Sequence, residues 1–284
     1  MRGRTCLVTG ATSGHGEAVA KALAAMGADL VIHGRSSGKC ERVAEEIRAL
    51  FGRRPSVLVC DLSSRSDVKR AAEEFLSRSR PLHVLVNNAG QVNEVFRETA
   101  DGVEETFAVN YLAMFQLTLL FLPRIIESVP ARIINVSSDT HRIAHLDLED
   151  PEGRKSRYSF MASYARSKLA IVYFTIELAR RLEGTGITVN AVDPGPVASA
   201  IARKQGMIAR LADWIIQRTF PSPEKAARTA VWLATDPAIQ GESGCYYRFM
   251  KKKEPKLTGG EIFGARLWEM SERMTGTSYP LKKN

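Results

Sequence analysis

Short apolar runs alternate with amphipathic segments along most of the chain. Runs of strand length lie at 5–10 (TCLVTG), 29–34 (DLVIHG), 56–61 (SVLVCD), 82–90 (LHVLVNNAG), 132–138 (RIINVSS) and 187–195 (ITVNAVDPG). Segments with helical periodicity lie near 15–26, 38–51, 65–78 and 101–127, and from 163 onward. The strand-like runs are rich in Val, Ile and Leu without strict alternation, so each is expected to be buried on both faces. The pattern predicts an α/β fold: a doubly wound, mainly parallel sheet of the Rossmann type with helices on both faces.

The chain has 284 residues and contains no repeat and no linker rich in Pro, Gly or Ser. This length suits one large α/β domain with a substantial core. We therefore expect a single domain over 1–284.

Polar and glycine-rich residues follow the strand-like runs. TGATSGHG (9–16) follows the first run, NNAG (87–90) the fourth, Ser137 and Ser138 the fifth, and DPGP (193–196) the sixth. In a doubly wound sheet, ligands bind at the carboxyl ends of the strands. These residues therefore mark the expected site.

Tyr164 and Lys168 stand four apart in a predicted helix, so they share one face. The ordinary interpretation is a half-buried aromatic beside a solubilising charge. The chemical interpretation is that the cation lowers the phenol pKa, which is near 10 in a free side chain, and makes the phenol a usable acid or base. The polar residues at the strand ends favour the chemical interpretation.

The glycine spacing Gly10-x-x-x-Gly14-x-Gly16 follows the first strand and opens the first helix. Glycines let the backbone approach a pyrophosphate, which a helix N-terminus then stabilises. This pattern predicts a nucleotide site.

Together, the glycine pattern, Asn87-Asn88-Ala89-Gly90, Ser138 and Tyr164-x-x-x-Lys168 resemble the short-chain dehydrogenases/reductases in order and spacing. The resemblance covers about residues 4–250. The segments ARIINVSSDTH (131–141), ELARRLEGTGITVNAVDPG (177–195) and ARLWEMSERMTG (265–276) are similar to the retinol dehydrogenase-like branch. The resemblance implies an oxidoreductase that interconverts a carbonyl and an alcohol with a nicotinamide cofactor.

The resemblance also implies roles for four residues. Tyr164 would exchange a proton with the substrate oxygen, and Ser138 would orient that oxygen. Lys168 would lower the tyrosine pKa and hold the nicotinamide ribose. Asn110 would support a water-linked proton relay, although an ordinary buried polar residue at a helix kink is the alternative.

The resemblance further implies a set of cofactor contacts. The turn 88–90 would line the adenosine ribose, Asp61 would receive the adenine amino group, and 194–199 would cover the nicotinamide. The full set is Gly10, Ser13, Gly14, His15, Gly16, Arg35, Ser36, Asp61, Leu62, Asn88, Ala89, Gly90, Tyr164, Lys168, Pro194, Gly195, Val197 and Ser199.

The segment HGRSS (33–37) predicts which cofactor is preferred. An NAD site places a carboxylate near the end of the second strand to bind the ribose 2′-hydroxyl. Here Gly34 fills that position and Arg35 follows, so a 2′-phosphate meets a guanidinium instead of a repelling acid. We therefore expect NADP(H), with Ser36 and Ser13 as further donors; a surface arginine at a strand end is the alternative.

Three features depart from the branch. His15 stands where Ile or Leu is usual, so its ring either touches the pyrophosphate or fills space. Asp193 replaces the usual His, which leaves the pocket near the nicotinamide undefined. The first strand begins at once, without the N-terminal membrane anchor common in the branch, so a retinoid substrate is not implied.

The segment 197–220 lies where the family builds its substrate lid. Its apolar face predicts a cover for a bulky apolar carbonyl compound. Packing on the core and peripheral contact with a membrane surface are the alternatives. The apolar helix at 101–127 suggests burial on two sides, and with the helix at 163–183 a homodimer is possible; the branch also includes monomers.

Composition argues against several other classes of protein function. The net charge is +9, but the charge is dispersed, which argues against nucleic acid; the run KKKEPK (251–256) is interpreted as a solvated loop. The longest apolar stretch, 111–122, is too short to span a bilayer, so no integral membrane segment is expected. The four scattered cysteines suggest the cytoplasm, and the histidines show no metal-binding spacing.

Two other functions are compatible with the sequence. One is an isomerase or dehydratase that retains its nicotinamide, and the other is a non-catalytic nucleotide-sensing scaffold. The complete Ser138, Tyr164 and Lys168 set argues against a scaffold, which has no physical use for all three.

Overall fold

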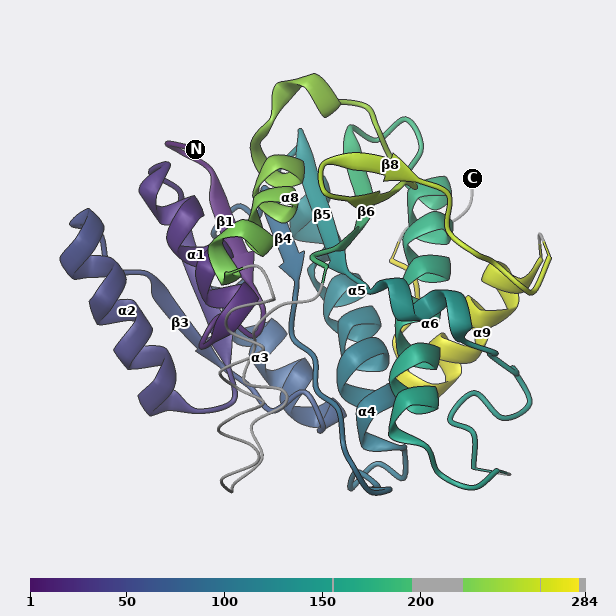
Figure 1. The fold of residues 1–284 in the computed structure, drawn as a ribbon. Coiled ribbons are helices and arrows are strands. Elements are labelled where there is room, and N and C mark those ends of the chain that lie inside the picture. The colour runs from purple at the N-terminus through teal and green to yellow at the C-terminus, as the bar shows by residue number, and fades with distance from the viewer. Residues whose placement is uncertain (155, 196–221, 261, 281–284) are drawn as a thin grey trace.

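The computed structural model describes residues 1–154, 156–195, 222–260 and 262–280. Among these residues, eight strands form one sheet in the order β3-β2-β1-β4-β5-β6-β7-β8, and all neighbours are parallel except β7 and β8 (Figure 1). The strand order reverses between β1 and β4, which start the two halves of a doubly wound sheet. The predicted fold class is confirmed.

The strands are β1 (Thr5–Val8), β2 (Asp29–Gly34), β3 (Ser56–Val59), β4 (Val84–Asn87), β5 (Ala131–Val136), β6 (Ile187–Asp193), β7 (Tyr246–Arg248) and β8 (Lys251–Lys253). The α-helices are α1 (Gly14–Ala25), α2 (Ser37–Phe51), α3 (Arg65–Ser77), α4 (Glu105–Phe107), α5 (Ala113–Ile126), α6 (Phe160–Arg181), α8 (Pro223–Thr235) and α9 (Phe263–Thr275). A π-helical segment η1 (Ala108–Leu112) joins α4 to α5, and 3-10 helices form η2 (Asp139–Ile143) and η4 (Pro237–Ile239).

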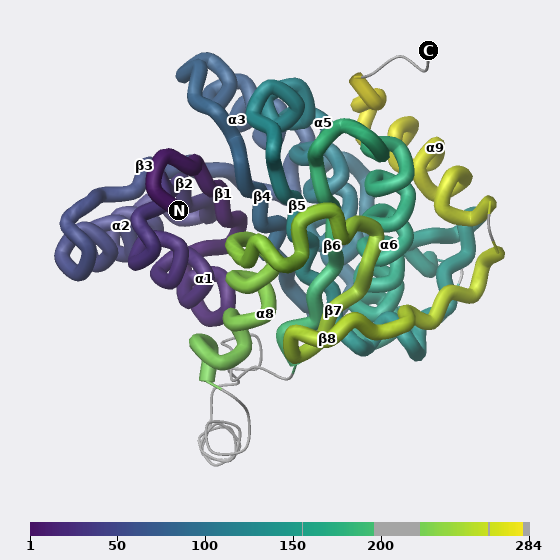
Figure 2. Tube along the Cα trace, turned by 90° about the horizontal axis from the view of Figure 1, so that it is seen from above, coloured from purple at the N-terminus to yellow at the C-terminus, as the bar shows by residue number. Residues whose placement is uncertain are grey.

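The helices cover the sheet in two layers. Figure 2 shows α1, α2 and α8 on one face, and α3, α5, α6 and α9 on the other. Each layer has its own apolar core, since the strand side chains point alternately to the two faces. This explains why the strand runs are apolar without strict alternation.

One part of the sequence interpretation is wrong. The lysine run begins with strand β8, which pairs antiparallel with β7, rather than lying wholly in a loop. The three lysines of β8 are exposed, as the interpretation expected. Lysines on an exposed edge strand oppose pairing with another chain, which is a common way to protect such an edge.

Helix α9 packs on α5 and α6 and covers part of their outer surface (Figure 2). The Trp268 ring stacks on Phe174 at a centroid distance of 5.6 Å and meets the edge of Phe115 at 5.1 Å. The Tyr111 hydroxyl hydrogen-bonds Ser271 at 2.7 Å. Much of the apolar surface that suggested a partner helix is therefore buried by the chain itself, and the homodimer stays a prediction.

The helical segment Glu105–Ile126 is 22 residues long and apolar enough, by length and composition alone, to cross a membrane. The prediction that no stretch reaches this length is therefore wrong. Within the protein, 78% of its most apolar window is buried, mainly against α3 and α6. Burial in the core accounts for its apolar composition.

Candidate active site

Helix α6 carries Tyr164 and Lys168 on one face. The helix begins at Phe160, where the Ser159 hydroxyl caps it by accepting a hydrogen bond from the Ala162 amide. The Lys168 side chain is buried, and its Nζ lies 5.3 Å from the centroid of the Tyr164 ring. The predicted one-turn spacing therefore places the ammonium over the phenol ring.

Ser138 lies two residues beyond the end of β5, at the start of η2. Its Oγ accepts a hydrogen bond from the Thr140 amide at 3.3 Å, which leaves the hydroxyl hydrogen free to donate. A hydrogen bond with Ser138 lowers the pKa of Tyr164. Ser138 therefore lies close enough to Tyr164 to act on its phenol.

The pKa of Tyr164 is nevertheless raised to about 12, because burial of the phenol outweighs the Ser138 hydrogen bond. Asp193 adds to the rise. The Lys168 ammonium donates to the Val136 carbonyl oxygen at 2.9 Å. The expectation that Lys168 lowers the Tyr164 pKa stays a prediction. The spacing of the two residues did not reveal the opposing rise that burial of the phenol causes.

The pKa of Lys168 is lowered to about 8, since burial penalises the ammonium. Asp193, at the carboxyl end of β6, acts in the opposite direction and raises it. Lys168 is therefore poised to lose its proton close to neutral pH.

Asn110 lies in the π-helical segment η1. Its Oδ1 accepts from the Gln91 amide at 2.7 Å, and its Nδ2 donates to the Gln91 carbonyl at 3.0 Å and to Ser167 Oγ at 3.1 Å. A Cβ atom on Gly90 would lie 3.4 Å from Asn110 Oδ1 and 3.6 Å from Lys168 Nζ. The structure thus brings Asn110 beside Lys168, and π-helical turns of this kind are frequent at functional sites.

The glycine loop packs against the turn after β4. Gly10 has a left-handed φ of +64°, and a Cβ there would lie 2.8 Å from the Ala89 backbone. A Cβ on Gly16 would lie 2.2 Å from Asn88 Nδ2, which itself donates to the Thr9 carbonyl at 2.8 Å. The glycines are therefore required for close approach of two protein segments, in addition to any ligand.

His15 is buried between α1 and the start of α8. Its Nδ1 lies 2.8 Å from Asn88 Oδ1, and its Nε2 has no hydrogen-bond partner among the described residues. Burial lowers the His15 pKa. The ring is thus fixed to Asn88, and both interpretations of this departure stay open.

The N-terminus of α1 differs from those of the neighbouring helices. Ser36, Ser64, Ser159 and Ser222 each accept a backbone hydrogen bond in the first turn of α2, α3, α6 and α8. Ser13, at the same position before α1, makes no such side-chain bond. The first-turn amides of α1 are therefore left to bind an anion, and this end of the sheet fits a dinucleotide pyrophosphate.

The end of β2 has no room for a carboxylate. A Cβ on Gly34 would lie 2.5 Å from Thr12 Cγ2 and 2.8 Å from Cys40 Sγ. Arg35 is exposed and makes no hydrogen bond or ion pair within the part of the chain that the structure describes. Ser36 Oγ accepts from the Lys39 amide at 3.4 Å.

The sequence did not reveal His33, which supports the glycine loop from β2. Its Nδ1 accepts from the Gly10 amide at 3.2 Å, so Nε2 donates to the Cys60 carbonyl at 3.1 Å. Burial lowers the His33 pKa to about 4 and keeps the ring neutral. The sequence signal that could have revealed this role is a histidine within an otherwise apolar, buried strand.

The remaining residues predicted to contact the cofactor lie where the strands end. Asp61 Oδ1 accepts from the backbone and the hydroxyl of Ser63, and Leu62 lines a small cavity with Ala89. Pro194 and Gly195 follow β6, and Gly195 has a φ of +76°. Val197, Ser199 and the predicted lid 197–220 lie outside the described residues.

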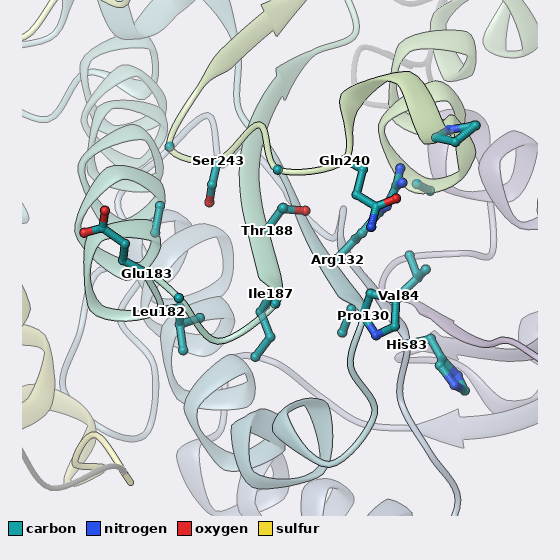
Figure 3. Close-up of a pocket in the computed structure, with 18 of the residues that line it drawn as sticks. His83, Val84, Pro130, Arg132, Leu182, Glu183, Ile187, Thr188, Gln240 and Ser243 are labelled. Carbon is teal, nitrogen blue, oxygen red and sulfur yellow. The ribbon is translucent and has the colours of Figure 1, made fainter.

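A separate cleft of about 880 Å³ lies at the amino ends of β4, β5 and β6 (Figure 3). Arg132, Ile187 and Ser243 are among its lining residues, and none of the predicted site residues lines it.

The residues that the structure describes contain no group of three or more His, Cys, Asp or Glu side chains that could hold a metal ion.

The fold and this site agree with what comparison with known proteins finds. Residues 4–207 match the short chain dehydrogenase family, to which the chain belongs. It is an oxidoreductase of that family.

Its relatives place it in the retinol dehydrogenase-like branch. It is 38% identical to the polyprenol dehydrogenase of Mus musculus, over 96% of this chain and 84% of that protein. It is 35% identical to retinol dehydrogenase 13 of Homo sapiens, over 98% of this chain and 86% of that protein. A crystal structure described as a putative NAD(P)-dependent gluconate 5-dehydrogenase from Beutenbergia cavernae, with bound NADP, is 32% identical with a TM-score of 0.69 and covers 88% of this chain and 96% of its own.

Proposed function

We propose that this protein uses NADPH to interconvert a carbonyl and an alcohol on a bulky, apolar substrate, with Tyr164 as general acid and base. The observation that carries the proposal is the meeting of a hydroxyl, a phenol and a buried ammonium at Ser138, Tyr164 and Lys168. Such a set matches what proton transfer to a carbonyl oxygen requires.

When bound, the reduced nicotinamide supplies a hydride to the carbonyl carbon. Tyr164 gives its proton to the carbonyl oxygen as that oxygen gains negative charge. Its pKa of about 12 supports a donor role, since the phenol stays protonated at neutral pH. Ser138, whose Oγ accepts from the Thr140 amide, turns its hydroxyl hydrogen toward the same substrate oxygen and orients it.

Lys168 acts on both partners of the reaction. Its ammonium stabilises the tyrosinate that remains after proton transfer, because opposite charges attract strongly in a buried site. The same ammonium binds the ribose hydroxyls next to the nicotinamide. Asn110, beside Lys168, supports the return of a proton from solvent to Tyr164.

Preference for NADPH is supported by the end of β2. The space at Gly34 is closed by Thr12 and Cys40, so the usual carboxylate of an NAD site has no place there. Arg35 is free to pair with a 2′-phosphate, which a guanidinium can bind through two hydrogen bonds. The NADP held by the related gluconate 5-dehydrogenase structure is consistent with this choice.

A bulky apolar substrate is supported by exposed apolar side chains on segments that follow the strand ends. Phe96, Ile143, Phe160, Met161 and Phe249 are all exposed. The relatives are named for polyprenol and retinol, which are apolar alcohols.

A panel of aldehydes and ketones tests the proposal, with loss of NADPH absorbance as the signal. We expect turnover that is faster for long apolar carbonyl compounds than for short polar ones. Failure of every carbonyl compound and alcohol in both directions would reject the proposed reaction. A location in the cytoplasm, a homodimer and peripheral membrane contact through 197–220 remain proposals of the same kind.

A further inference from the structure

A chain of ion pairs joins the end of β6 to the turn that carries Ser138. Asp193 Oδ2 lies 3.2 Å from Arg248 Nε, and Arg248 Nη1 lies 2.9 Å from Asp139 Oδ2. Arg142 Nε completes the chain at 2.7 Å from Asp139 Oδ1. These contacts hold the ends of β6 and β7 against η2, the element that begins directly after Ser138.

Asp193 is the buried member of this chain, with only 3% of its surface exposed. Its Oδ1 accepts from the Gly195 amide at 2.8 Å. Its Oδ2 accepts no hydrogen bond among the described residues. The contact between Oδ2 and Arg248 is therefore an ion pair without hydrogen-bond geometry. A buried carboxylate held in this way keeps much of its electrostatic effect on its surroundings.

The groups that interact with Asp193 come from each element packed around it. They are Arg248 and Tyr246 on β7, Asp139 and His141 on η2, and Tyr164 and Lys168 on α6. Of these, Lys168 is the buried cation of the reaction site. Its Nζ donates to the carbonyl oxygen of Val136 at 2.9 Å, and Val136 pairs in the sheet with Val192, the residue before Asp193. Asp193 is the carboxylate that raises the Lys168 pKa against the effect of burial.

Arg248 is one of the groups that influence the charge of Asp193. Burial raises the Asp193 pKa, and the hydrogen bond from the Gly195 amide and the charge of Arg248 lower it. Arg248 therefore favours the ionised carboxylate, and the ionised carboxylate favours the ammonium form of Lys168. The charge of Arg248 therefore influences Asp193, and the charge of Asp193 influences Lys168 in the reaction site.

We propose that Asp193 is a positioning residue whose carboxylate, paired with Arg248, keeps Lys168 protonated while the Arg248–Asp139 pair holds the Ser138 turn in place. This gives a role to the residue that departs from the usual histidine of the branch. The catalytic consequence rests on the proposed function, because it requires Lys168 to act as an ammonium. The charge relationship itself does not depend on which reaction the protein performs.

The test is the titration of Lys168, followed by NMR on protein with isotope-labelled lysine, in which Lys168→Met assigns the signal. We expect Asp193→Asn to lower the Lys168 pKa by roughly 1 unit from the wild-type value. Asp139→Asn is the matched control, since it removes a carboxylate from the same chain of ion pairs but not the one that acts on Lys168; it should leave the titration unchanged. If the asparagine variant does not fold, Asp193→Asn with Arg248→Met removes both charges of the Asp193–Arg248 ion pair.

Two results would overturn the proposal: an unchanged Lys168 titration without Asp193, or an equal shift in Asp139→Asn. Either would make the pair a purely structural link between β6 and β7. The measurement uses no substrate, so failure of the carbonyl panel would reject the proposed function and leave this result standing.

Discussion

The ammonium of Lys168 lies 5.3 Å from the centroid of the Tyr164 ring, one turn along α6, and donates to the Val136 carbonyl at the end of β5. Lys168→Ala removes a charge assigned to two tasks, so both turnover and NADPH affinity should fall. Steady-state kinetics and cofactor binding by fluorescence measure the two effects separately. The exposed Lys69→Ala is the control and should change neither. A loss of turnover with unchanged cofactor affinity would show that the assigned ribose contact is wrong.

The pH dependence of carbonyl reduction should follow Lys168. Its pKa of about 8 lies far below the Tyr164 pKa of about 12, so the lysine loses its proton first as the pH rises. The reaction needs the ammonium, so the rate should be highest below pH 8 and fall as the pH rises through that value. A rate that stays constant or increases through this range would contradict the role given to Lys168.

Protein stability should fall on acidification in a window set by His33. Its folded-state pKa is about 4, below the ordinary value of 6.5, so between these values the unfolded chain binds the proton more readily. The stability that the neutral ring contributes is therefore present above pH 6.5 and lost as the pH falls toward 4, by up to about 3 kcal/mol. Urea unfolding at several pH values measures this loss. His33→Gln should reduce the pH dependence in this window, and an unchanged dependence would mean that other groups cause it.

The glycine loop should not tolerate a side chain at Gly16. A Cβ there would lie 2.2 Å from Asn88 Nδ2 and 2.4 Å from the Gly10 carbonyl oxygen. We expect Gly16→Ala to weaken NADPH binding by at least tenfold and to lower the thermal midpoint. Gly38→Ala is the matched control: it lies in α2 with nothing within 4 Å of its Cβ, and alanine favours a helix by up to about 1 kcal/mol. Equal behaviour of the two variants would contradict this account of the loop.

Cofactor preference should depend on Arg35. One charged hydrogen-bonded contact contributes about 1.5–3 kcal/mol, so Arg35→Ala should lower kcat/KM with NADPH roughly tenfold to a hundredfold. Kinetics with NADH should hardly change, because NADH has no 2′-phosphate. Arg273→Ala, an exposed arginine on α9, serves as the control. A wild-type protein that prefers NADH would show that this interpretation of the loop after β2 is wrong.

The sequence predicted those features that depend on local pattern. Apolar runs located the six longer parallel strands. Residue spacing placed Tyr164 and Lys168 on one helix face, and the family resemblance added Ser138 to them. The short strands β7 and β8 were missed, because three residues carry little periodic signal. The strand at the lysine run is held by pairing with β7, which local composition does not reveal.

Interactions between segments far apart in the chain could not be predicted from the sequence either. His33 and Thr9 support the nucleotide loop through hydrogen bonds to residues 23 and 79 positions away, Gly10 and Asn88. The rise of the Tyr164 pKa was missed for the same reason, since it comes mainly from burial of the phenol by the whole fold. The covering of α5 by α9 likewise depends on tertiary packing.

The most direct test of the account is Tyr164→Phe, assayed by NADPH consumption with the best carbonyl compound from the panel. The change keeps the ring and removes only the hydroxyl, so cofactor affinity and thermal stability should stay close to those of the wild type. General acid catalysis contributes about 10²–10⁴ in rate, and turnover should fall by at least a hundredfold. Retention of more than about a tenth of wild-type turnover would contradict the assignment of Tyr164 as the proton donor.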